Sequence, residues 1–177
     1  MLYRVKQFLW AIGSNFKEID YKYVDKFLDS KEKELFNKLK HNEKHHSIRV
    51  CKDAINISKE KNIKIDDKII GKLSLLHGIG KGEHSLNIFE KSILVILNKI
   101  TNGKLRRLDN IKNIDIYYNH GEKGATLLKE YNKYDKEFLE AIEFHHNDKF
   151  SGNNKLLDII REIGRAHVWT PVTRIYL

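Results

Sequence analysis

The segment LSLLHGIGK, residues 73–81, ends an apolar helical pattern with a histidine. Ile70, Leu73 and His77 recur at i, i+3 and i+7, so a helix that buries Ile70 and Leu73 also brings His77 to the edge of the core. A histidine at a helix C-terminus is also typical of a helix-dipole contact or of a hydrogen-bonded core residue. The segment alone therefore leaves a metal ligand and a structural histidine open.

The two glycines after this histidine predict a sharp change of chain direction. Glycine has no Cβ and tolerates conformations that other residues avoid, so Gly78 and Gly80 let the chain turn away from the helix. Lys81 follows them, and we expect it to be a mobile cation suited to a phosphate or another anion.

Length and composition predict one compact domain with a basic surface. The chain has 177 residues, of which 41% are hydrophobic, and this is enough to bury a core. Its formal net charge of +9 attracts phosphates, nucleic acid or an anionic membrane. The chain is rich in Lys, Asn and Ile, as A/T-rich coding produces, and it has no RNA-binding aromatic motif. Nucleic acid is therefore a possible partner that the sequence does not favour.

Cysteine usage and the N-terminal segment predict a cytoplasmic protein. Cys51 is the only cysteine, so no intramolecular disulfide can form. It lies in an apolar helical pattern, and we expect a small buried residue there instead of a nucleophile. The apolar patch in residues 1–13 is too short to span a bilayer, so no membrane partner is expected.

Helical periodicity covers most of the chain, and no proline precedes position 171, so the sequence predicts an all-α fold. We expect a helical bundle with a small N-terminal helical extension: residues 1–41 pack on a domain at 42–162, and 163–177 form a non-native tail. The helix at 87–100 is apolar enough to be central. The predicted helices are 2–12, one capped by Asp20, one starting at Asp29 or Ser30, 42–61, one capped by Asp66 or Asp67, 87–100, one opening at 119–121, and 134–146.

Histidines stand at inward or terminal positions of four of these helices. They are His46, His77, His120 and the adjacent pair His145 and His146. Each buried imidazole needs partners for two nitrogens, and a shared metal would satisfy several of them together. Imidazole suits Mn, Fe, Co, Ni or Zn, so the pattern predicts a metal site whose ion stays open.

Four segments in this order resemble the HDIG-type branch of the HD-domain metal-dependent phosphohydrolases over residues 42–162. They are HSIRV at 46–50, LLHGIGK at 75–81, NHGEKGATLLK at 119–129 and IEFHHND at 142–148.

This resemblance implies a helical bundle with one or two divalent ions, Mg among the candidates, held by the five histidines. It also implies that Lys81 and Arg49 bind the phosphate of a small phosphomonoester or phosphodiester, nucleotides included.

Two departures from the family pattern predict weak activity. Gly78 stands where the family has an Asp that bridges two metals, so we expect a weakened or single-metal site unless Glu83 or water substitutes. Gly164 stands where the family has its last Asp, and EIGRAHVWTPVT at 162–173 resembles a translated sequencing adapter. We therefore expect a truncated chain with little or no hydrolase activity. The alternative is an inactive HD-like module that senses a nucleotide or binds a protein.

Overall fold

The computed structural model describes residues 17–84, 86, 88–147 and 150–169. These residues form helices and connecting loops, and no strand occurs among them. The predicted all-α class is therefore confirmed, while the predicted helix at 2–12 lies outside the described residues. In the same described part, no helix is both long and apolar enough to cross a membrane.

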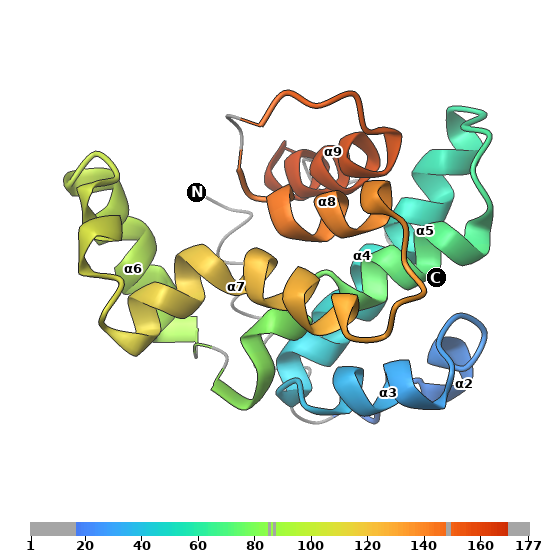
Figure 1. Cartoon of the computed structure of the whole chain (residues 1–177), viewed down its shortest axis with the longest axis horizontal. Coiled ribbons are helices and arrows are strands. Elements are labelled where there is room, and N and C mark those ends of the chain that lie inside the picture. Colours follow the sequence, from blue (N-terminus) through green and yellow to red (C-terminus); the bar gives the residue numbers. More distant parts are fainter. Residues whose placement is uncertain (1–16, 85, 87, 148–149, 170–177) are drawn as a thin grey trace.

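Local capping signals set the starts of several helices as predicted. The side chains of Asp20, Asp29 and Asp66 accept hydrogen bonds from backbone N–H groups at the starts of α2, α3 and α5. The elements, shown in Figure 1, are α2 (Tyr21–Val24), α3 (Ser30–Asn37), α4 (His41–Glu60), α5 (Asp67–Leu76), η1 (Ile79–His84), α6 (Ile88–Ile100), η2 (Lys104–Leu108), α7 (Lys112–Lys129), α8 (Lys136–Phe144) and α9 (Lys155–Trp169).

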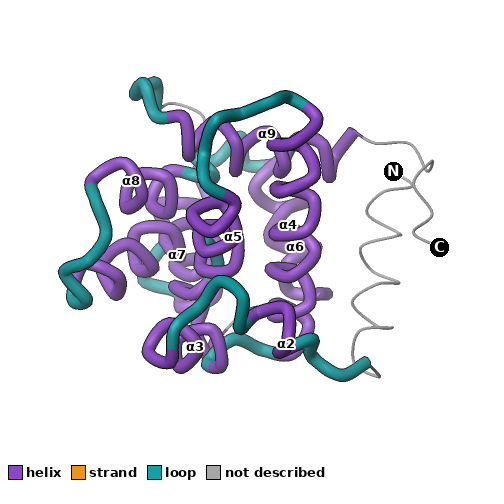
Figure 2. The backbone as a smooth tube through the Cα atoms, turned by 90° about the vertical axis from the view of Figure 1, so that its right-hand side faces the viewer, coloured by secondary structure: helices purple, strands orange, loops and turns teal. Residues whose placement is uncertain are grey.

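Helix α5 lies at the centre of the bundle. It contacts α3, α4, α8 and α9, and Figure 2 shows these helices around it. Ile70 and Leu73 are fully buried, with 0% and 1% of their surface exposed. Val24 and Phe36, from the predicted N-terminal extension, belong to the same hydrophobic core. The apolar face that the sequence placed inside therefore carries His77 to the centre of the molecule.

Helix α6 is peripheral, so its predicted central position is wrong. It packs against α7 and η2 at one edge of the molecule, seen at the left of Figure 1. Leu94 is buried, but Ile93, Ile96 and Ile100 are 56%, 58% and 72% exposed. An apolar sequence indicates that a helix can be buried. It does not indicate which of several apolar helices the others will pack around.

The predicted helix start at 119–121 is also wrong, because α7 is one continuous helix of 18 residues with His120 in its interior. The glycines here serve close packing. A Cβ on Gly121 would lie 2.4 Å from the carbonyl oxygen of Glu143, and a Cβ on Gly80 would lie 1.9 Å from that of His120. Gly80 is therefore needed for the approach of η1 to α7, more than for the turn that the sequence suggested.

Helix α9 continues through Trp169, into the region predicted to be a non-native tail. Ile163 is 1% exposed and belongs to the core. The origin of residues 163–177 stays a prediction.

Candidate metal centre

Five histidine rings from four helices form one contiguous cluster. His46 comes from α4, His77 ends α5, His120 lies within α7, and His145 and His146 follow α8. The distances between ring centres are 5.5 Å for His46–His77, 5.4 Å for His77–His145, 5.2 Å for His120–His145, 5.1 Å for His120–His146 and 4.1 Å for His145–His146. The fold thus brings together all five histidines that the sequence singled out.

Three of these histidines contact a backbone carbonyl of their own helix through Nδ1. A carbonyl oxygen only accepts, so Nδ1 must carry the proton, and the lone pair is left on Nε2. Histidines that bind metals commonly make this same contact, because it orients the ring. The distances are 2.7 Å for His77 to Ser74, 3.0 Å for His120 to Ile116 and 2.6 Å for His145 to Ile142.

His145 gives the strongest indication of a ligand site. Its buried Nε2 atom has no hydrogen-bond partner among the described residues. Burial, and then the nearby imidazoles of His146, His120 and His77, lower the pKa of His145 well below its usual value. The ring is therefore neutral at physiological pH and can offer its lone pair.

His120, His145 and His146 can hold one ion together. One ligand atom from each lies within 4.8 Å of the other two. Their chemistry suits a divalent transition metal, so the residues present fit the predicted cofactor.

Lys81 is not the mobile cation that the sequence suggested. Its Nζ atom donates to Glu43 Oε2 at 2.7 Å, and only 9% of its side chain is exposed. The salt bridge joins η1 to α4 beside the histidines, so Lys81 is held in place by a carboxylate.

Gly78 leaves room for a larger side chain. A Cβ at this position would lie 3.8 Å from Lys81 Nζ and 3.9 Å from Ser47 Oγ, which are ordinary contacts. Packing therefore does not require glycine here, and an aspartate would place its carboxylate near Lys81 and the histidines.

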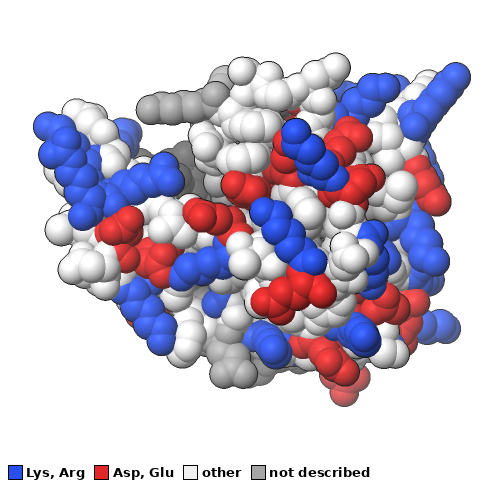
Figure 3. Space-filling model, in the orientation of Figure 1, with Lys and Arg blue, Asp and Glu red and all other residues white. Residues whose placement is uncertain are grey.

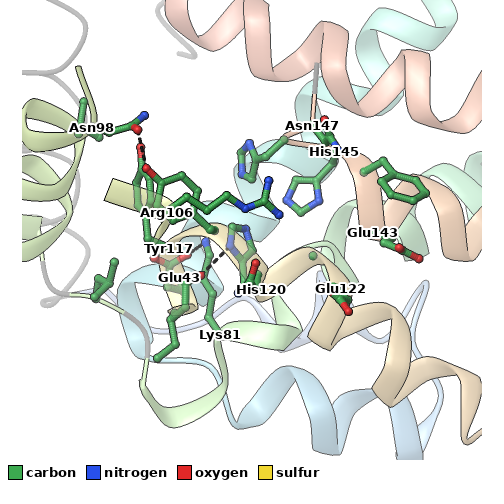
Figure 4. Close-up of a pocket in the computed structure, with 18 residues that line it drawn as sticks. Glu43, Lys81, Asn98, Arg106, Tyr117, His120, Glu122, Glu143, His145 and Asn147 are labelled. Carbon is green, nitrogen blue, oxygen red and sulfur yellow. Dashed lines mark hydrogen bonds and ion pairs between the residues drawn. The ribbon is translucent and has the colours of Figure 1, made fainter. Parts of the chain in front are cut away.

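A cavity of about 550 Å³ opens beside this cluster. Figure 4 shows His120 and His145 on one side of it and Arg106 reaching in from the other. The predicted phosphate ligand Arg49 is not among its lining residues, and neither are His46 and His77. The lining includes His120, His145, His146, Glu43, Lys81, Arg106, Tyr117, Tyr118, Asn98 and Asn147.

Glu43 and Arg106 are charged residues of this cavity that the sequence analysis did not single out. Glu43 precedes His46 by three residues on α4, and this Glu-x-x-His spacing puts both on one helix face, so it could have been found. Arg106 has no such signal, because its place depends on how η2 folds against α7.

One of three comparisons with known proteins gave a match. A family model described as the HD domain matches residues 44–165, which is more than half of the chain. The chain therefore belongs to the HD domain family, and membership implies the chemistry of a metal-dependent hydrolase superfamily. Searches of curated proteins and of solved structures gave no significant match.

Proposed function

We propose that this protein is a metal-dependent phosphohydrolase that cleaves a phosphomonoester or a phosphodiester, nucleotides included. The observation that carries the proposal is the buried Nε2 atom of His145, which has no protein partner in the described part of the chain. It lies beside His120 and His146 in the wall of a cavity large enough for a small molecule. Family membership supports the same chemistry.

The histidines would hold the ion and the cavity would hold the substrate. A divalent metal at His120, His145 and His146 would supply Lewis-acid activation of a phosphoryl oxygen and of a water. The Nδ1–H contacts fix two of these rings before any ion binds. His46 and His77 extend the cluster beyond the residues that line the cavity, where they would complete the coordination of one ion or hold a second.

Gly78 limits the activity that we expect. An aspartate at this position would add one negative charge and up to two metal contacts, and both are absent. Since the space beside Ser47 and Lys81 admits a longer side chain, Gly78→Asp should raise metal content and hydrolysis together.

The test compares the parent chain with Gly78→Asp after purification with Mn or Ni. Metal is measured by elemental analysis, and hydrolysis is measured with p-nitrophenyl phosphate and its diester. We expect little turnover by the parent and a clear gain in both quantities for Gly78→Asp. Asn153→Asp adds a carboxylate to an exposed loop and is the matched control, with no expected gain. Robust turnover by the parent would contradict this assignment of ligands, and absence of metal from both chains would contradict the site itself.

A catalytically inactive module is the second candidate, and Gly78 is the observation that favours it. Such a protein would use the cavity to sense a nucleotide or to bind a protein partner. It predicts that Gly78→Asp binds metal and still fails to hydrolyse either ester.

Nucleic-acid binding has less support from the surface. In the face shown in Figure 3, Lys and Arg side chains are interspersed with Asp and Glu over the middle and right, and only a small group at the left edge is basic alone. Nucleic-acid binding would show a steep salt dependence that chelation leaves unchanged.

We also propose a cytoplasmic location. Cys51 is buried, and burial raises the pKa of its thiol to about 12. An unreactive free thiol of this kind is compatible with a reducing compartment.

A further inference from the structure

Arg106 reaches the cavity from the side opposite the histidines. It lies in η2, and its guanidinium carbon is 5.9 Å from the centre of the Tyr118 ring. Figure 4 shows its side chain extending toward His120 and His145. A planar cation that extends into a cavity beside potential metal ligands is well placed for a phosphate.

The other cations expected to bind phosphate are less available. Lys81 is buried and joined to Glu43 by a salt bridge. Arg49 is absent from the lining of the cavity. Arg106 lines the cavity, its side chain is exposed, and no ion pair joins it to another residue within the described ranges. Its charge is therefore available to a ligand.

The corner that carries Arg106 is fixed by several hydrogen bonds. The Tyr118 hydroxyl donates to Asn98 Oδ1 at 2.5 Å and so joins α7 to α6. The backbone N–H of Leu105 donates to Thr101 Oγ1 at 3.2 Å. Gly103 has a φ of 80°, which lets the chain turn from α6 into η2. Arg106 therefore extends from a turn that hydrogen bonds hold in place, and the Tyr118 ring lies beside its guanidinium.

We propose that Arg106, in place of Lys81 or Arg49, is the residue that binds the substrate phosphate, and that Tyr118 positions it. This assignment rests on the proposed function in one respect, which is that the ligand is a phosphate ester. The guanidinium donates two parallel N–H bonds to phosphate oxygens, and the Tyr118 ring limits the orientations of the guanidinium. The phosphate then lies between Arg106 and the face of the cluster formed by His120, His145 and His146.

The test measures binding of inorganic phosphate to the full chain by calorimetry, once with the metal-free protein and once with the Mn-loaded protein. Loss of a charged hydrogen bond predicts that Arg106→Gln weakens phosphate binding roughly 10-fold to 100-fold. Arg106→Lys keeps the charge without the planar fork and should recover only part of the affinity. Tyr118→Leu should weaken binding about two-fold to five-fold.

Arg107→Gln is the matched control, since Arg107 is exposed on the same short helix and does not line the cavity. We expect its affinity to stay within about two-fold of the parent. Metal content, measured by elemental analysis, should be equal in all four variants.

The outcomes separate this assignment from the proposed function. An unchanged affinity for Arg106→Gln, an equal loss for Arg107→Gln, or a parent that binds no phosphate in either metal state would overturn the role of Arg106. A parent that binds phosphate through Arg106 and takes up no metal would uphold the assignment and contradict the hydrolase proposal.

Discussion

Two buried polar clusters in this molecule differ in how their polar atoms are satisfied. In the first, both oxygens of Glu32 have protein partners, although the residue is 0% exposed. Oε1 accepts from the Tyr134 hydroxyl at 2.5 Å, from Lys72 at 2.8 Å and from Lys133 at 3.0 Å. Oε2 accepts from the backbone N–H of Asp29 at 2.8 Å, which completes a capping box on α3.

The histidine cluster is equally buried at its centre but remains incomplete. The Nε2 atom of His145 has no hydrogen-bond partner in the described residues. An unsatisfied buried polar group costs free energy, and it persists where a bound ligand supplies the contact. The Glu32 cluster is thus completed by protein groups alone, while the histidine cluster has ligand atoms that could hold an ion.

The largest expected effect on stability comes from Glu32→Gln. The change removes the negative charge that Lys72 and Lys133 share, although Lys133 keeps its contact with Asp29, and it leaves one acceptor oxygen where there were two. It should therefore lower the free energy of unfolding by about 3 kcal/mol. Denaturant unfolding at pH 7 measures it. Glu34→Gln, on the exposed face of the same helix, should change stability by less than about 0.5 kcal/mol. Equal effects of the two changes would remove the structural role of Glu32.

The next effect concerns His145→Gln and depends on metal. An ion at 100 times its dissociation constant stabilises a folded protein by about 2.7 kcal/mol, and the variant should lose most of this gain. The measurement is the difference between thermal unfolding midpoints with Mn and with excess chelator. His41→Gln, at an exposed histidine, should keep the gain of the parent. A gain that survives in His145→Gln would show that the ion binds elsewhere.

The smallest effect is a pH dependence from Glu32. Burial alone would raise its pKa, but hydrogen bonds from Lys72, Tyr134 and other donors outweigh burial and hold the pKa below its ordinary value of 4.5. A lowered pKa in the folded state means stability that is present above pH 4.5 and is lost as the pH falls through the folded value. The pKa of Asp29 is also lowered and acts in the same direction.

We therefore expect the unfolding midpoint of the parent to fall with pH below about 4.5, more steeply than that of Glu32→Gln. Thermal unfolding followed by circular dichroism across this range measures both slopes. Glu34→Gln should reproduce the slope of the parent. Parallel curves for the parent and Glu32→Gln would mean that other carboxylates govern acid unfolding.

Much of the fold could be predicted because its signals are local. The capping aspartates Asp20, Asp29 and Asp66 act within one helical turn, and the apolar spacing before His77 predicted that Ile70 and Leu73 are buried. The position of α6 could not be predicted in this way. Its apolar face has the same pattern as that of a helix in the core. Its place at the edge follows from how the other helices pack.

The histidines of the candidate site could be named because each stands in a recognisable segment. The salt bridge between Glu43 and Lys81 could not be predicted, because it joins residues 38 positions apart on different elements. The same holds for Arg106, whose place at the cavity depends on the folding of η2 against α7.

The sequence by itself determined the helical class, most helix starts, the family and the five histidines. Periodicity and capping act over a few residues, and the resemblance to the family rests on four short segments, so none of these needs the tertiary structure. Only the tertiary structure decided which helix is central, that Lys81 forms a salt bridge with Glu43, and that Arg106 lines the cavity. These are contacts between distant segments, and their geometry exists only once the helices have packed.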